Sequence, residues 1–147
     1  MLEVKVKKLI PKAVIPTYAH AGDAGMDITC TSYEYDKEHD CYMYHSGLAF
    51  ELPKGYVMLI FPRSSNRKTD YYLTNHVGVL DSGYRGDLMF AFKKRDDNRE
   101  NFNKPPYEIG DRIGQIIILP YPVVKMMEVD ELSSSERGEG GFGSTGN

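Results

Sequence analysis

Cysteines, long apolar runs and helical periodicity are scarce in this sequence, and their scarcity narrows the possible fold classes. It has two cysteines in 147 residues, no run of eighteen apolar residues, no apolar leader near its start and almost no sustained 3.6-residue periodicity. These features argue against a disulfide scaffold, a membrane-spanning helix, a secreted protein and a helical fold. The sequence therefore predicts a cytoplasmic protein without a membrane partner.

Dense positive charge is also missing. The net charge is −3, the isoelectric point is near 5.8, and the lysines and arginines are scattered. A nucleic-acid surface requires a basic stripe, so the composition predicts no nucleic-acid partner. A small anionic ligand remains compatible, because a few local cations are enough to bind one.

Short apolar runs with a period of two dominate the chain and predict an all-β fold, either a jelly roll or a distorted β-barrel. Strands are expected over residues 2–7, 41–44, 48–52, 56–61, 88–92, 113–119 and 123–129, with the second and third of these paired as a hairpin around Ser46-Gly47. One short helix, capped by serines, is expected to start at Ser64. The polar segment 95–104 is expected to be an exposed loop.

The chain length suits one domain. We expect a β domain over residues 1–130 and a flexible C-terminal segment over residues 131–147. Five of the fourteen glycines are in the last ten positions, and glycine is costly to order. Taken alone, such a tail is typical of a disordered linker.

Metal-ligating side chains are sparse in the sequence. His39, Cys41 and His45 are close together, but they lie in an alternating, strand-like stretch and have no clear fourth ligand. We interpret them as strand residues and the two cysteines as reduced thiols.

Five clusters interrupt the β pattern with polar and small residues. They are Ala21 to Ile28, Pro62 to Ser65, Asn75 to Asp87, Gly110 to Gln115 and Arg137 to Asn147. Each has an ordinary explanation as a turn or a solvated surface. In this order and spacing, however, they closely resemble the five motifs of the trimeric dUTPase family. The stretches at 78–87 and 137–146 match the family patterns almost completely.

The resemblance implies a jelly-roll homotrimer with active sites between subunits. It also implies hydrolysis of dUTP to dUMP and pyrophosphate with Mg²⁺, which limits uracil incorporation into DNA and supplies dUMP. Asp81 would be the catalytic base, Asp27 would hold the metal through water, and the substrate phosphates would supply most metal ligands. Tyr84 would exclude a 2′-hydroxyl. The full set of implied substrate-binding residues is Arg63, Ser64, Ser65, Asn75, Gly78, Tyr84, Asp87, Leu88, Met89, Gln115, Arg137, Phe142, Gly143, Ser144 and Thr145.

Within that set, the resemblance implies a separate role for each group of residues. Residues 86–89 would read the uracil edge, and Arg63, Ser64 and Gln115 would contact phosphates or water. Arg137 with Ser144 and Thr145 would bind the γ-phosphate, and Phe142 would cover the base. The tail would then be a lid that closes over the nucleotide.

Two other functions remain open from the sequence. The first is the related dCTP deaminase class, which would release ammonia from dCTP. The second is a regulatory or interaction protein with the dUTPase fold, switched by nucleotide. The third cluster with its tyrosine and the Phe-Gly-Ser-Thr stretch in the tail favour the dUTPase interpretation.

Overall fold

The structure is a computed structural model that describes residues 1–95 and 104–141. Its strands are β1 (Lys5–Lys8), β2 (Met26–Thr29), β3 (Ser32–Asp36), β4 (Cys41–His45), β5 (Leu48–Glu51), β6 (Tyr56–Phe61), β7 (Tyr71–Leu73), β8 (Gly78–Leu80), β9 (Met89–Lys94) and β10 (Arg112–Pro120). The 3₁₀-helix η1 spans Ser64–Lys68. The all-β prediction is confirmed, and the antiparallel sheets fit a jelly roll.

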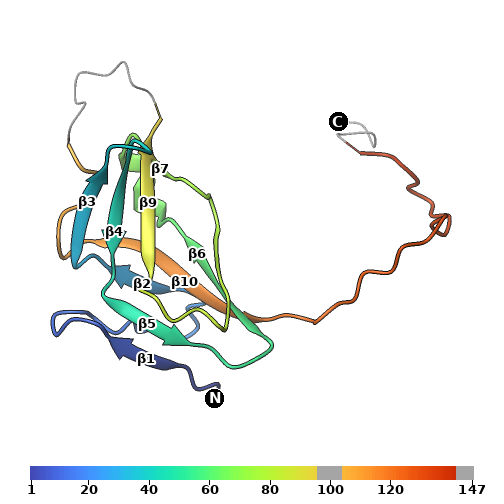
Figure 1. The fold of residues 1–147 in the computed structure, drawn as a ribbon, viewed down its shortest axis with the longest axis horizontal. Coiled ribbons are helices and arrows are strands. Elements are labelled where there is room, and N and C mark those ends of the chain that lie inside the picture. The colour runs from blue at the N-terminus through green and yellow to red at the C-terminus, as the bar shows by residue number, and fades with distance from the viewer. Residues whose placement is uncertain (96–103, 142–147) are drawn as a thin grey trace.

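Two four-stranded sheets face one another, and a short two-stranded sheet, β1-β5, completes the body (Figure 1). One four-stranded sheet has the order β2-β10-β6-β8, and the other has the order β3-β4-β9-β7. Their inner faces form the core. Large side chains such as Tyr44, Phe92, Met58 and Ile116 are fully buried there. Their removal from water is the main stabilising contribution, at about 25 cal/mol per Å².

The register of the sheet β2-β10-β6-β8 determines where the polar clusters lie. Asp27 in β2 is directly opposite Gln115 in β10, and Gln115 is opposite Phe61 in β6. On the other side of β6, Leu80 is paired with Met58. The residues that follow Phe61 and those that follow Leu80 therefore emerge at opposite ends of β6.

The hairpin expected around Ser46-Gly47 is wrong. β4 pairs with β3 and β9, whereas β5 pairs with β1. Gly47, with φ of 68°, is a corner where the chain passes from one sheet to another. Two alternating runs joined by a short turn indicate strands but do not identify their partners.

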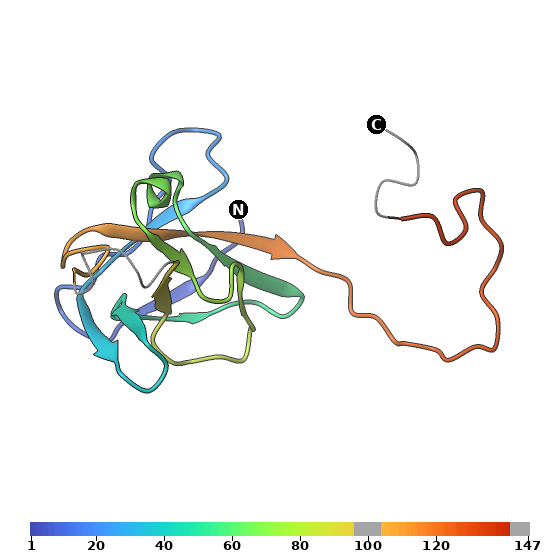
Figure 2. The same ribbon diagram turned by 90° about the horizontal axis from the view of Figure 1, so that it is seen from above.

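The strand expected at 123–129 is also wrong, since that segment has no regular structure. After β10 the chain leaves the sheets, as both ribbon views show (Figure 2). A strand requires a ladder partner, and Val123 and Met126 are 86% and 87% exposed. The boundary predicted at residue 130 stays a prediction.

The helix after β6 is present where the sequence predicts it, but its expected serine cap is absent. Arg63 is the N-cap residue and its side chain makes no capping hydrogen bond. The turn is instead closed by the backbone N–H of Asn66, which donates to the Arg63 carbonyl at 2.9 Å. No helix in residues 1–95 and 104–141 is long and apolar enough to pass through a bilayer.

Candidate active site

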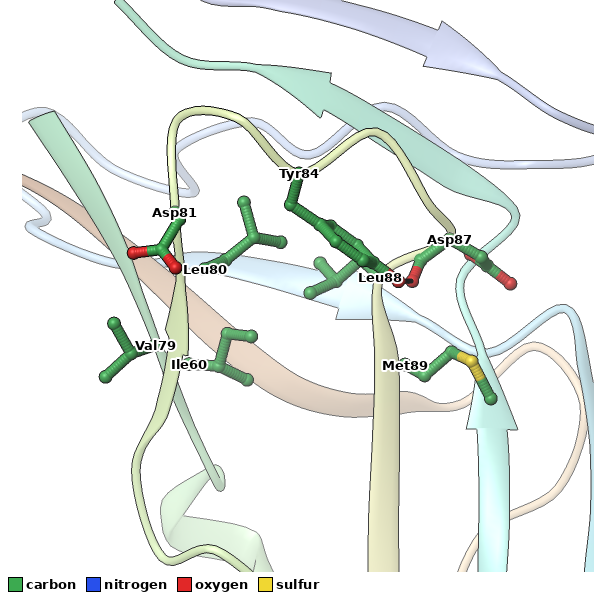
Figure 3. Close-up of a pocket in the computed structure, with 8 residues that line it drawn as sticks. All are labelled: Ile60, Val79, Leu80, Asp81, Tyr84, Asp87, Leu88 and Met89. Carbon is green, nitrogen blue, oxygen red and sulfur yellow. Dashed lines mark hydrogen bonds between the residues drawn. The ribbon is translucent and has the colours of Figure 1, made fainter. Parts of the chain in front are cut away.

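The third polar cluster forms a cavity of about 220 Å³ between β8 and β9, here called the Asp81 cavity (Figure 3). It is lined by Ile60, Val79, Leu80, Asp81, Tyr84, Asp87, Leu88 and Met89. Five of these, Asp81, Tyr84, Asp87, Leu88 and Met89, are among the residues implied by the resemblance. Ile60, Val79 and Leu80 were not, because in the sequence they are indistinguishable from core residues.

Asp81 and Asp87 lie on opposite sides of this cavity, and the Tyr84 ring extends between them (Figure 3). Asp81 directly follows β8 and is exposed. Within residues 1–95 and 104–141 its carboxylate has no hydrogen bond or ion pair. The carboxylate is therefore available to accept a proton from a bound molecule.

Tyr84 is held in place by its neighbours. Its hydroxyl donates to the Asp87 carbonyl at 3.0 Å. A Cβ added to Gly86 would lie 2.3 Å from that hydroxyl oxygen, so the ring rests against the bare glycine backbone. The Arg85 guanidinium donates to the carbonyl oxygens of Ser82 and Tyr84 at 2.6 and 2.9 Å, which fixes the loop after Asp81.

A second group of polar residues lies at the other end of β6 and is here called the Asp27 cluster. It consists of Asp27, Arg63, Arg112 and Gln115. Arg63 Nε donates to Asp27 Oδ1 at 2.8 Å, and Arg112 Nη1 donates to Oδ2 at 3.1 Å. Both carboxylate oxygens are therefore occupied by guanidinium groups, which carry their positive charge at all physiological pH values.

The Asp27 cluster borders a polar cavity of about 350 Å³ lined by Thr17, Ala19, Asp23, Ala24, Gly25, Asp27 and Gln115. Gln115 Nε2 donates to the Pro62 carbonyl at 3.0 Å. A Cβ on Gly25 would lie 2.9 Å from Gln115 Oε1, so only glycine allows this close approach. The result is a compact group of two cations and one carboxylate beside a hydrophilic space.

The two sites are far apart within one chain. Asp81 lies four residues along the strand direction and three strands across from Asp27. With about 3.3 Å per residue and about 4.8 Å between strands, the separation is roughly 20 Å. A single water or phosphate group cannot contact both.

The remaining implied residues lie elsewhere. Ser65 accepts a hydrogen bond from Arg63 Nη1 at 3.3 Å, whereas Ser64 is exposed at the start of η1. Asn75 lies in the turn before β8 and Gly78 is the first residue of β8; neither lines the Asp81 cavity. Arg137 donates to the Gly140 carbonyl in the extended tail. Phe142, Gly143, Ser144 and Thr145 lie outside the described residues.

The fold and these sites define an all-β protein with one apolar, carboxylate-edged cavity and one cationic, phosphate-compatible cluster. The dUTPase family model matches residues 11–146, and the chain belongs to this family. The deoxyuridine 5′-triphosphate nucleotidohydrolases of Alkaliphilus metalliredigens and Clostridium acetobutylicum are both 37% identical over 147 residues. The alignments cover 99% of this chain and 99% and 98% of those proteins.

The chain is also similar to solved structures of dUTPases. A mutant of the dUTPase of Staphylococcus bacteriophage 80alpha, in a structure with dUpNHpp, has a TM-score of 0.78 and 30% identity over 99% of both chains. A mutant of the dUTPase from phage phi11 of S. aureus has a TM-score of 0.72 and 25% identity, and its structure reveals the coordination of a structural Mg(II) ion. This match covers 90% of the present chain and 99% of the phage chain.

Proposed function

We propose that this chain is a dUTP diphosphatase that converts dUTP to dUMP and pyrophosphate. The observation that carries the proposal is the Asp81 carboxylate at the edge of an apolar cavity, beside the Tyr84 ring and without a hydrogen bond or ion pair in the described part of the chain. Membership of the dUTPase family supports it. The dUpNHpp bound by the phage 80alpha relative supports dUTP as the substrate.

In this proposal Asp81 accepts a proton from the water that attacks the α-phosphorus. A general base must lie within hydrogen-bond reach of the water. The exposed position of Asp81, whose carboxylate has no hydrogen bond or ion pair within the described residues, supports this role. The leaving pyrophosphate then departs from the opposite side of the phosphorus.

The Asp81 cavity would select the deoxyuridine part of the substrate. The Tyr84 ring would pack against the deoxyribose and leave no room for a 2′-hydroxyl. Backbone groups over residues 86–89 would pair with the uracil edge, and a hydrogen-bonding site of this kind can reject the wrong partner by roughly 10⁴-fold. The methyl group of thymine would overfill the slot, at a cost of about 1–3 kcal/mol.

The Asp27 cluster would receive the phosphate chain. Arg63 can release part of its contact with Asp27 to bind a phosphate oxygen, and Gln115 can order a water beside it. The hard oxygen donors of Asp27 and Asp23 around this polar cavity fit Mg²⁺ held through water, with the substrate phosphates as its direct ligands. When bound, Mg²⁺ would neutralise phosphate charge.

We further propose that the working form is a homotrimer in which the two sites come from different copies. The separation of roughly 20 Å between Asp81 and Asp27 supports this, because one dUTP must contact both groups. The segment after β10 also supports it. Val123, Met126, Met127 and Leu132 are each at least 80% exposed, and such apolar groups are normally covered by a partner.

The C-terminal segment 131–147 would act as a lid, with Arg137, Ser144 and Thr145 on the γ-phosphate and Phe142 over the uracil. Ordering such a segment costs about 1–2 kcal/mol per residue, so it should close only when base and γ-phosphate are both bound. A cytoplasmic location and the absence of nucleic-acid and membrane partners stay part of this proposal.

The two alternative functions are less well supported. The family match is to dUTPase, which does not favour dCTP deamination. The phage 80alpha dUTPase is described as controlling the transfer of virulence genes, and that description concerns the phage protein. In this chain no feature of the described residues favours a regulatory role over hydrolysis.

The proposal is tested by comparing the unsubstituted chain with Asp81→Asn in a pyrophosphate-release assay with dUTP and Mg²⁺. Asparagine keeps the shape and removes the base, so kcat should fall by about 10²–10⁴-fold. Calorimetry should show that Asp81→Asn binds dUTP with nearly unchanged affinity. Full activity in this variant would remove Asp81 from the role of base.

A further inference from the structure

The Asp87 carboxylate points away from the cavity and is anchored to the corner between β4 and β5. Its Oδ1 accepts hydrogen bonds from Ser46 Oγ at 3.1 Å, from the Gly47 amide at 2.8 Å and from the Leu48 amide at 3.2 Å. Its Oδ2 lies 2.9 Å from His45 Nδ1. An ionised carboxylate only accepts, so Nδ1 carries the proton in this contact.

The backbone of Asp87 faces the other way and holds Tyr84. Its carbonyl accepts the Tyr84 hydroxyl, while the Tyr84 ring lies against Gly86. Asp87 therefore positions the Tyr84 ring through its backbone carbonyl, while its own side chain is anchored outside the cavity. Any rotation of Asp87 about its backbone would move the Tyr84 hydroxyl with it.

His45 is well placed to prevent such a rotation. Its carbonyl accepts the Thr31 amide at 2.8 Å, and it is directly opposite Met89, a cavity residue, across β4 and β9. Its side chain is 27% exposed and that of Asp87 is 19% exposed. Three donors share Oδ1, and among the described residues His45 is the partner of Oδ2, so His45 fixes the rotation of the carboxylate.

We propose that His45, through Asp87, is a positioning residue that sets the Tyr84 ring for recognition of the deoxyribose. The proposal rests on the proposed function of the cavity. His45 lies outside all five clusters that resemble the dUTPase motifs and is not itself among the residues that line the cavity; its side chain contacts the cavity lining through Asp87. It acts on the nucleotide only by way of the Asp87 peptide.

The test compares His45→Leu with His45→Asn in the full-length protein. Leucine fills the space without a donor, whereas asparagine places an N–H near the position of Nδ1. For His45→Leu we expect KM for dUTP to rise about tenfold, the factor that corresponds to about 1.4 kcal/mol, and the preference for dUTP over UTP to fall. The kcat should stay within about twofold, because Asp81 lies on the other side of the cavity. His45→Asn should restore KM.

Two control variants separate this effect from general damage. His39→Leu removes a chemically similar pair, since His39 Nδ1 lies 2.8 Å from Asp36 Oδ2 on the exposed turn between β3 and β4. Glu34→Gln alters the exposed carboxylate 3.8 Å from His45 Nε2. Both should keep the original KM and the original discrimination against UTP.

An unchanged KM and unchanged UTP discrimination in His45→Leu would overturn the proposal. So would an equal change in His39→Leu, or a failure of His45→Asn to restore KM. A crystal structure of His45→Leu without nucleotide gives a readout independent of activity. The Tyr84 ring should leave Gly86, and a ring still seated there would refute the positioning role. If the unsubstituted chain fails to hydrolyse dUTP, the proposed function fails, and the ring position still decides this inference.

Discussion

Two inactive variants of this protein should restore each other's activity when they are assembled together. The perturbations are Asp81→Asn, which removes the proposed base, and Arg63→Gln, which removes the charge beside Asp27. Each variant alone should lose about 10²-fold or more of its kcat, the usual cost of removing a base or an electrostatic contact. Asp81→Asn is nearly isosteric, and Arg63→Gln leaves a shorter polar side chain while Arg112 still pairs with Asp27, so the fold should be retained.

The magnitude of the restoration follows from the separation of the two sites. Asp81 and the Asp27 cluster lie roughly 20 Å apart within one chain, so a site in the proposed trimer would combine Asp81 from one copy with Arg63 from another. In trimers reassembled from equal amounts of the two variants, each position is filled at random. About one site in four should then have both native residues, which restores about a quarter of the native activity.

The assay is pyrophosphate release from dUTP after the two variants are unfolded together and refolded as a mixture. The control is the same pair refolded separately and then combined, which should stay inactive. A second control is the double variant, which carries Arg63→Gln and Asp81→Asn in one chain. An equal mixture of this variant and the native chain should have about half of the native activity when the two are folded separately. The same mixture should have about a quarter when they are refolded together. A co-refolded mixture as inactive as its parents would refute the shared site, because it would mean that Asp81 and Arg63 act within one chain.

Three further predictions follow from other parts of the structure. Gly114→Ala should lower stability by about 1–3 kcal/mol, seen as a lower Tm, because its Cβ would lie 2.0 Å from the buried Phe90 ring; Gly83→Ala, which meets open space, is the control. Deleting residues 137–147 should leave Tm and the circular dichroism spectrum unchanged while hydrolysis falls steeply, and a fully active truncation would show that the tail is only a linker. Burial raises the pKa of Cys30 to about 11, so iodoacetamide at pH 8 should modify this thiol only after urea is added; rapid alkylation of the native protein would contradict this.

The strands that carry longer apolar runs were predictable, because alternating apolar residues reflect a half-buried strand wherever its partners lie; the short strands β2, β3, β7 and β8 were not among the expected runs. The run at 56–61 matches β6, and the run at 113–119 lies within β10. Pairing was not predictable in the same way. The runs at 41–44 and 48–52 suggested a hairpin, yet they belong to different sheets. The alternation specifies a buried face but says nothing about which strand covers the edge.

The apolar run at 123–129 predicted a strand that the structure does not contain. Its composition suits a strand, but a strand exists only where its backbone groups find a neighbour, and within the described residues this segment finds none. Its exposed side chains fit a segment that is completed by another copy. No property of the run itself distinguishes these two situations.

The candidate site was predictable as far as its motifs reach. Resemblance identified Asp81, Tyr84, Asp27 and Arg63, and the structure distributes them over two sites at opposite ends of β6. That division depends on register, which a local pattern does not contain. His45 drew notice in the sequence only as a weak metal ligand, and its contact with Asp87 joins residues 42 positions apart.

The central claim is most directly tested by measuring pyrophosphate release from dUTP, dTTP, dCTP and UTP with Mg²⁺, with ammonia monitored in the same samples. The account predicts pyrophosphate from dUTP, little from the other three nucleotides, and no ammonia from dCTP. Equal turnover of dUTP and dTTP would contradict the uracil-selective cavity. Ammonia from dCTP would assign the protein to the deaminase class instead.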